Sequence, residues 1–289
     1  MNNYNFEMTN QGLKLTGSDD EPIHAVVPAY VDGEPVKVIG RYAFSAQPKL
    51  KSVTLPATVN RIDAYAFYNS CNLEQLNLSA GVRYIDGGSF KRCNKLHTIT
   101  MKGQQHLNQL MADIYNEVTV EITLEDGSFF KILLPEYYYT YEEFVQPRLY
   151  NAVNYNSGTY YRNALLADRI NFAIYDKAFI HSVLLDEPRT VILLALYRLH
   201  YPYQLEDAAR EDYKNYLAQH REEAASFLLE KEDWDLLESF LALDLYDAAS
   251  LQELIRLASD RELAQAVSLM MDYKLKHFGQ AKKKKKFAL

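Results

Sequence analysis

Hydrophobic and polar positions follow a pattern between residues 36 and 101 that recurs three times. Val36-Lys-Val-Ile-Gly-Arg-Tyr-Ala-Phe44 is followed by Val59-Asn-Arg-Ile-Asp-Ala-Tyr-Ala-Phe67 and then by Val82-Arg-Tyr-Ile-Asp-Gly-Gly-Ser-Phe90. The step is constant, since 67 − 44 = 23 and 90 − 67 = 23. It also relates Ile39, Ile62 and Ile85; Leu50, Leu73 and Leu96; and Val53, Leu76 and Ile99. A fixed period of this length predicts a solenoid, in which stacked units share one core.

Each repeat carries a short strand. In Ser52-Val-Thr-Leu-Pro56 two aliphatic residues alternate with two hydroxyl residues, which predicts a half-buried strand. Pro56 ends it because proline has no N–H to donate. We expect the phenylalanines of successive repeats to interlock, so that Phe44, Phe67 and Phe90 form a row inside the core.

Strand patterns also flank the repeats. Residues 1–35 predict an atypical first unit, in which Val27-Pro28 takes the place of Leu55-Pro56, with a spacing of 55 − 27 = 28. After a helically spaced segment at residues 102–117, residues 118–134 alternate around an Asp126-Gly127 turn and predict a hairpin. We expect this hairpin to extend or cap the open end of the solenoid, because an uncovered sheet edge invites aggregation.

The pattern Leu-x-x-Val-x-Leu-Pro-x-x-Val-x-x-Ile-x-x-x-Ala-Phe at step 23 resembles the BspA-type leucine-rich repeats of bacteria. The resemblance covers about residues 23–101, and Val27-Pro28, Gly33 and Pro35-Val36 resemble the start of such arrays. It implies a right-handed solenoid with a sheet on one face that binds other molecules. Many members of this family are long and secreted, so the resemblance also implies surface adhesion as an alternative function.

The C-terminal part of the chain has a helical pattern. From about Arg162 onward the spacing is helical, with apolar residues mostly at steps of three and four, and residues 189–278 are predicted to form a helical domain. Asp260 is expected to be the N-cap of its last helix. The rhythm from Lys231 to Lys276 resembles degenerate ankyrin repeats without their Thr-Pro-Leu-His motif, and a plain helical array is the alternative.

The predicted fold class is therefore α+β and multidomain. We divide the chain into a solenoid with its N-terminal cap and closing hairpin (1–135), a tyrosine-rich bridge (136–188), a helical domain (189–278) and a lysine-rich tail (279–289). The bridge is interpreted either as packing between domains or as a contact surface for a partner. The tail is expected to be disordered, with a clasp onto acidic protein surfaces, or binding to anionic membrane or nucleic acid, as alternatives.

Charge argues against nucleic acid as the partner of the body. The net charge is −7, and residues 102–281 carry 16 basic and 29 acidic residues, a balance of 16 − 29 = −13. An acidic surface repels a phosphate backbone. The polar start Met-Asn-Asn-Tyr-Asn-Phe does not resemble a signal peptide, and no apolar run is long enough to span a membrane, so a cytoplasmic location is expected.

No motif for catalysis is recognisable in the sequence. It lacks a glycine-rich phosphate loop, Gly-x-Ser-x-Gly, His-Glu-x-x-His and Cys-x-x-Cys. Cys71 and Cys93 are interpreted as small buried hydrophobic residues, and Cys93-x-x-x-His97 lacks further metal ligands at zinc spacing. We therefore predict no catalytic, cofactor-binding or metal-binding residue.

The function predicted from these observations is that of a non-catalytic, protein-binding module, an intracellular scaffold or adaptor with a protein partner. The candidate contact residues are polar strand positions and tyrosines of the bridge: Ser52, Thr54, Gln75, Asn77, Thr98, Thr100, Tyr138 and Tyr141. The alternatives are that these residues merely face solvent, that the protein is a surface adhesin, or that it is an enzyme with a site in an interdomain cleft.

Overall fold

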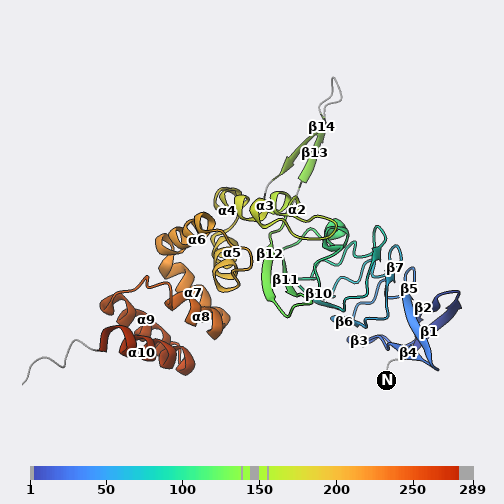
Figure 1. Ribbon diagram of the computed structural model, residues 1–289, viewed down its shortest axis with the longest axis horizontal. Coiled ribbons are helices and arrows are strands. Elements are labelled where there is room, and N and C mark those ends of the chain that lie inside the picture. The colour runs from blue at the N-terminus through green and yellow to red at the C-terminus, as the bar shows by residue number, and fades with distance from the viewer. Residues whose placement is uncertain (1–2, 138, 144–149, 155, 280–289) are drawn as a thin grey trace, which may run out of the picture. The chain divides into compact units, whose positions relative to one another are not determined.

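A computed structural model describes residues 3–137, 139–143, 150–154 and 156–279 (Figure 1). The chain divides into two compact units, residues 1–187 and residues 188–289. The first unit contains all the strands found in the described residues, and the second contains helices. The predicted α+β architecture, a β-solenoid followed by a helical region, is confirmed. The finer division into a bridge and a tail stays a prediction.

The solenoid has two sheets, and its coils alternate between them (Figure 1). The first sheet has the order β1-β2-β5-β7-β9, with strands β1 (Tyr4–Thr9), β2 (Gly12–Ser18), β5 (Glu34–Ile39), β7 (Arg61–Ile62) and β9 (Tyr84–Ile85); β4 (Tyr30–Val31) pairs with β5. The second sheet has the order β12-β11-β10-β8-β6-β3, with strands β3 (His24–Val26), β6 (Ser52–Leu55), β8 (Gln75–Leu78), β10 (Thr98–Lys102), β11 (Val118–Thr123) and β12 (Phe129–Leu134).

Strand register follows the 23-residue period. Ser52 lies opposite Gln75, and Gln75 lies opposite Thr98, in parallel strands. At the N-terminal side, Val26 lies opposite Thr54, a spacing of 54 − 26 = 28. The predicted atypical first unit with its longer spacing is thereby confirmed. The antiparallel β1–β2 hairpin covers the N-terminal end of the first sheet, as a terminal unit must when the repeats beyond it are missing.

The core is a row of stacked phenylalanine rings between the two sheets. Phe44 and Phe67 stack with centroids 5.3 Å apart, and Phe67 and Phe90 with centroids 5.0 Å apart. All three side chains are buried. The predicted row is confirmed.

Buried hydrogen bonds join Phe44 and Phe67 to the coil that follows. Ser70 Oγ donates to the carbonyl of Phe44 at 2.5 Å, and one period later Cys93 Sγ donates to the carbonyl of Phe67 at 3.2 Å. Burial raises the pKa of the Cys93 thiol to about 12, so this side chain behaves as a neutral packing residue. Cys71 does not: it is exposed, and the prediction that both cysteines are buried was wrong for it. It lies one residue past the inward position that Ser70 occupies.

The β11–β12 hairpin extends the second sheet, as predicted. β11 runs parallel to β10 and β12 antiparallel to β11, which leaves β12 as the edge strand. Helix α3 (Phe172–Lys177) covers this edge. The Tyr175 hydroxyl accepts from the Leu133 N–H at 3.1 Å and donates to the Leu133 carbonyl at 2.6 Å, while the rings of Phe130 and Phe172 meet edge to face. The N–H and carbonyl of Leu133 at this edge are thus satisfied by a side chain instead of another strand.

The remaining elements of the first unit are short. They are α1 (Leu107–Leu110), the 3-10 turn η1 (Met111–Asp113), the β13 (Tyr139–Glu143) and β14 (Tyr150–Asn154) hairpin, α2 (Gly158–Arg162) and α4 (Phe179–Leu185). The apolar residues predicted to share a helical face in the first of these segments, Leu107, Leu110, Met111 and Ile114, are all buried. From the tyrosine-rich segment, Tyr161 and Tyr175 are fully buried within the first unit and meet edge to face.

The second unit contains six helices in the described residues: α5 (Pro188–His200), α6 (Asp207–Gln219), α7 (Arg221–Lys231), α8 (Trp234–Leu241), α9 (Ala248–Asp260) and α10 (Ala264–Phe278). Two hairpins, α7–α8 and α9–α10, repeat at a step of 30 residues. Glu232 and Glu262 both have a positive φ between the helices of a hairpin, and 262 − 232 = 30. Phe240 and Met270 are the corresponding buried residues. The ankyrin-type assignment of these hairpins stays a prediction.

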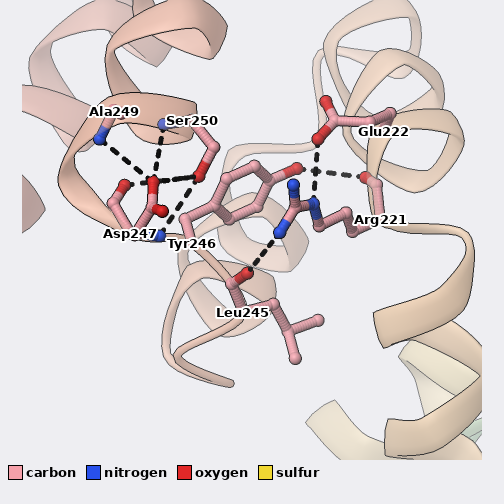
Figure 2. Close-up of polar contacts among 7 residues, drawn as sticks. All are labelled: Arg221, Glu222, Leu245, Tyr246, Asp247, Ala249 and Ser250. Atoms are coloured by element: carbon pink, nitrogen blue, oxygen red, sulfur yellow. Dashed lines mark hydrogen bonds and ion pairs between the residues drawn. The ribbon is translucent and has the colours of Figure 1, made fainter.

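A polar network joins the start of α7 to the loop before α9 (Figure 2). The Tyr246 hydroxyl donates to the Arg221 carbonyl at 3.1 Å, and the Arg221 guanidinium donates to the Leu245 carbonyl at 3.3 Å. Asp247 caps α9, because its Oδ1 accepts from the backbone N–H groups of Ala249 and Ser250. The contacts fix successive hairpins to one another.

The N-cap predicted for the last helix was wrong. Asp260 is the final residue of α9, and the N-cap of α10 is Leu263, which has no side-chain cap. The preceding helix continues further than the apolar spacing indicated, and a left-handed residue, Glu262, turns the chain.

Candidate protein-contact surface

Two rows of side chains, polar except for Val26, cross the outer face of the second sheet. One row consists of His24, Ser52, Gln75, Thr98 and Thr119, and the other of Val26, Thr54, Asn77, Thr100, Glu121 and Lys131. The aliphatic residues between them point into the core. Residues of one row come from equivalent positions of successive coils because the strands are parallel and the period is constant.

The rows are ordered by hydrogen bonds between neighbouring strands. Asn77 Nδ2 donates to Thr54 Oγ1 at 3.2 Å, and Thr100 Oγ1 donates to Glu121 Oε2 at 3.2 Å. His24 Nδ1 lies 2.8 Å from Ser52 Oγ. These contacts fix side-chain rotamers before any partner arrives, which lowers the entropy lost on binding.

The centre of the face is uncharged, and its two margins differ. At the β11–β12 margin Glu121 and Lys131 form an ion pair at 2.9 Å. At the β3 margin Val26 is 62% exposed. The face therefore offers hydroxyl and amide groups in its middle, an ion pair on one side and an exposed valine on the other.

Six of the predicted contact residues are brought together on this face: Ser52, Thr54, Gln75, Asn77, Thr98 and Thr100. Gln75 is exposed and the other five are half-buried. Of the two predicted tyrosines, the one that the structure describes belongs to a different sheet. Tyr141 lies in β13, which pairs only with β14 in a separate sheet, and Tyr138 lies outside the described residues.

Sequence reasoning missed several members of this face. Thr119 and Glu121 belong to β11, and their alternation with valines was visible in the sequence. Only their parallel pairing with β10, in which Thr98 lies opposite Thr119 at a spacing of 119 − 98 = 21, places them on the same face. His24 joins it through the pairing of β3 with β6.

Other chemistry-bearing groups lie elsewhere in the first unit. Ser157 Oγ donates to Asp186, and the hydroxyls of Ser157, Ser182 and Tyr161 form a chain with steps of 2.9 Å. Burial raises the pKa of the Asp186 carboxyl, against the opposing effect of its bonds from Ser157. Three of these residues are fully buried, so the network ties the start of α2 to the end of α4.

The histidine and cysteine that stood four residues apart do not form a ligand pair. Cys93 is bonded to a backbone carbonyl inside the core, whereas His97 is exposed and its Nδ1 lies 2.9 Å from Thr98 Oγ1. Across the described ranges, no group of three or more His, Cys, Asp and Glu side chains is arranged to hold a metal ion. Nor does any helix described here combine the length and hydropathy required to cross a membrane.

A pocket of about 490 Å³ was not foreseen from the sequence. It lies where β8, β10 and β11 end, and it is lined by the side chains of Val82, Ile85, Met101 and Leu110 together with polar residues at its mouth. The 23-residue pattern of aliphatic residues fails at residues 105 and 108, and this break in the sequence could have indicated the pocket.

Comparisons with known proteins agree with the repeat pattern. The BspA type leucine rich repeat region, in six copies, matches residues 32–126. No curated protein matches the chain.

Three of the solved structures with similarity to the chain are bacterial leucine-rich repeat proteins. One, from Bacteroides capillosus, is 34% identical over 34% of this chain and 76% of its own, with a TM-score of 0.32. A second, from Bacteroides ovatus, is 26% identical over 36% of this chain and 30% of its own, with a TM-score of 0.30. A leucine rich cell surface protein from Faecalibacterium prausnitzii is 20% identical over 44% of this chain and 43% of its own, with a TM-score of 0.30.

Proposed function

Because the chain belongs, through residues 32–126, to the BspA-type leucine-rich repeat proteins, we propose that it is a non-catalytic scaffold or adaptor that binds another protein. Repeats of this kind support a binding role. The contact surface proposed is the outer face of the second sheet. The observation that carries this proposal is the pair of aligned polar rows on a sheet that the phenylalanine row holds rigid.

The composition of the face supports a protein as the partner. Hydroxyl and amide side chains both donate and accept hydrogen bonds, so they match the mixed polar groups of a protein surface. The exposed side chain of Val26 at one margin supplies apolar area that water leaves on association. The Glu121–Lys131 pair at the other margin favours one orientation of a charged partner.

Two substitutions on this face provide the test. Replacing Gln75 and Thr98 together by arginine introduces bulk and charge at neighbouring positions of one row, without touching the core. Partners recovered by affinity capture from the native cell are identified by mass spectrometry, and the binding of each purified partner is then measured by calorimetry. We expect the double variant to bind at least about tenfold more weakly, which corresponds to about 1.4 kcal/mol.

A matched control keeps the change in charge but moves it off the sheet face. Gln11→Arg and Gly87→Arg add the same two positive charges at exposed positions in the β1–β2 turn and in the turn that follows β9. They should leave partner binding unchanged. A purified partner that binds the Gln75→Arg/Thr98→Arg variant as tightly as the unmodified chain would rule out this face as the contact surface.

We further propose that the scaffold works in a reducing compartment inside the cell. The exposed thiol of Cys71 supports this, since exposed free thiols are unstable in oxidising compartments. Surface adhesion is the alternative. Cleavage of the protein by protease added to intact cells would support adhesion, and protection until the cells are lysed would support the intracellular location.

A further inference from the structure

The two sheets of the solenoid end at different coils. The second sheet continues past the third repeat through β10, β11 and β12, whereas the first sheet ends at the two-residue strand β9. In the described part of the chain no strand pairs with β9 on the side away from β7. The C-terminal end of the first sheet is therefore an open edge.

The repeat register explains why the first sheet stops. Val82 and Ile85 would be followed at step 23 by residues 105 and 108, since 82 + 23 = 105 and 85 + 23 = 108. Those positions hold Gln105 and Asn108, which cannot supply an aliphatic pair. Instead the chain turns at His106, whose φ is 63°, and enters helix α1.

The missing strand leaves apolar side chains uncovered. Val59 and Ile62 are fully buried because the next coil covers them with Val82 and Ile85. Val82 and Ile85, which lack such a cover, are only half-buried. They line the pocket of about 490 Å³, a volume within the range of ligand-binding sites.

Two backbone carbonyls at the same edge accept no hydrogen bond from the residues that the structure describes. The Asn60 carbonyl accepts from the Arg83 N–H, and the Ile62 carbonyl accepts from the Asp86 N–H, each at 2.9 Å. The corresponding carbonyls one period later belong to Arg83 and Ile85 of the terminal strand. An added strand in the same register would donate its N–H groups to these two carbonyls.

The mouth of the pocket is predominantly basic. Arg83, Lys102 and His106 line it, with Glu125 as the acidic residue among its lining side chains. The buried Nδ1 of His106 has no hydrogen-bond partner within the described ranges. An acidic side chain at the mouth would be attracted by the two permanent cations.

We propose that this pocket and the edge of β9 together bind an extended segment of a partner protein. The segment adds a parallel strand next to β9 and places a Val-x-x-Ile pair on Val82 and Ile85. The same packing is present one coil earlier, where Val82 and Ile85 cover Val59 and Ile62. The basic mouth selects a segment with an acidic residue beside the aliphatic pair.

This site is separate from the outer face of the second sheet, so it goes beyond the function proposed above. A second copy of the chain is not the occupant we favour. The N-terminal end of its first sheet presents the β1–β2 hairpin, and Phe6 and Met8 there do not form a Val-x-x-Ile pair. Self-association through β9 is an outcome that the experiment below detects.

The probe is a synthetic peptide, Leu-Pro-Ala-Thr-Val-Glu-Arg-Ile-Asp, which reproduces residues 55–63 with Asn60→Glu. The glutamate takes the position opposite Arg83 that Asn60 has in the coil below. Binding of the fluorescently labelled peptide to the full chain is measured by polarisation. We expect saturable binding, and an affinity at least about tenfold weaker when both the valine and the isoleucine of the peptide are replaced by aspartate.

A second peptide tests the strand pairing itself. N-methylation of its final aspartate removes the N–H that would donate to the Ile85 carbonyl, while every side chain is kept. We expect at least about tenfold weaker binding. Equal affinity of the methylated and unmethylated peptides would overturn strand addition.

Protein variants locate the site. Val82→Arg fills the pocket and Lys102→Glu reverses the charge at its mouth, and both should weaken binding about tenfold or more. Because Lys102 is exposed, its variant tests the proposal even if Val82→Arg lowers the thermal stability. Gln75→Ala on the sheet face should bind the peptide normally, which separates this proposal from the function proposed above.

Any one of three results would contradict the proposal. The first is the absence of peptide binding at concentrations up to about 1 mM. The second is normal binding by both Val82→Arg and Lys102→Glu. The third is self-association of the unmodified chain, measured by analytical ultracentrifugation, that is abolished by Val82→Arg and competes with the peptide.

Discussion

The phenyl rings of Phe44 and Phe67 lie almost parallel, with 5° between their planes and 5.3 Å between their centroids. They belong to successive coils, and Phe90 continues the stack at 5.0 Å. Each ring thus fills space between two coils instead of within one. This is the physical form of a solenoid core, in which every unit completes the burial of its neighbours.

Removal of the central ring should be severely destabilising. Phe67→Ala leaves a cavity between two stacked rings, so we expect it to lower the free energy of unfolding by about 3–5 kcal/mol. Urea denaturation followed by circular dichroism measures the change. Tyr84→Ala removes a ring that is 59% exposed and should cost less than about 1 kcal/mol. Equal costs for the two variants would contradict the stacked core.

The hydroxyl of Tyr175 satisfies both backbone groups of Leu133 at the edge of the second sheet. Tyr175→Phe keeps the buried ring but leaves a buried N–H and carbonyl unpaired, which should cost about 1–3 kcal/mol. Amide hydrogen exchange should accelerate at Leu133. Tyr30→Phe, which alters an exposed side chain, serves as the control and should leave both quantities unchanged. Unaltered exchange at Leu133 in Tyr175→Phe would refute the capping role.

Asp247 accepts hydrogen bonds from two N–H groups in the first turn of α9 (Figure 2). Asp247→Ala removes this cap and should destabilise the helical unit by about 1 kcal/mol. Asp260→Ala is the matched control, because Asp260 ends the same helix and caps nothing there. Its negative charge lies near a helix C-terminus, so its removal should be neutral or slightly stabilising. Thermal unfolding monitored at 222 nm distinguishes the two variants.

The half-buried carboxyl of Asp186 makes stability depend on pH. Its pKa is raised chiefly by burial, so the folded chain holds this proton more tightly than the unfolded chain does. Its contribution to the free energy of unfolding therefore falls as pH rises from the ordinary Asp value of about 3.9 through the raised pKa. Asp186→Asn cannot titrate and should lose this slope, which urea titrations between pH 4 and pH 7 would measure. An identical pH dependence in both proteins would show that Asp186 does not titrate in this range.

The repeat and its spacing could be predicted from the sequence alone. The row of Phe44, Phe67 and Phe90 and the offset of 28 residues between Val26 and Thr54 follow from spacing alone. The spacing predicts these contacts because parallel coils place equivalent residues next to one another. Residues that lie one period apart in the chain are therefore neighbours in the fold.

Errors and omissions arose at residues that do not recur with the period. Cys71 was expected in the core but is exposed, since it lies beside the inward position of its turn. Asp260 was expected to begin a helix that it does not begin, because α9 continues through it. The edge contact between Tyr175 and Leu133 joins residues 42 apart in the chain and belongs to no repeat, so no sequence pattern predicted it.

The sequence by itself determined the solenoid, its register and the polar rows on its outer sheet, because a 23-residue period repeats the same local choice of strand, turn and buried ring. Only the tertiary structure decided how the array ends. Where the array ends depends on which side chains from outside the repeats cover each sheet. The Tyr175 side chain binds the edge strand β12 of the second sheet. At the end of the first sheet, Val82 and Ile85 line an open pocket beside β9. Those contacts are non-local and occur once, so no periodicity encodes them.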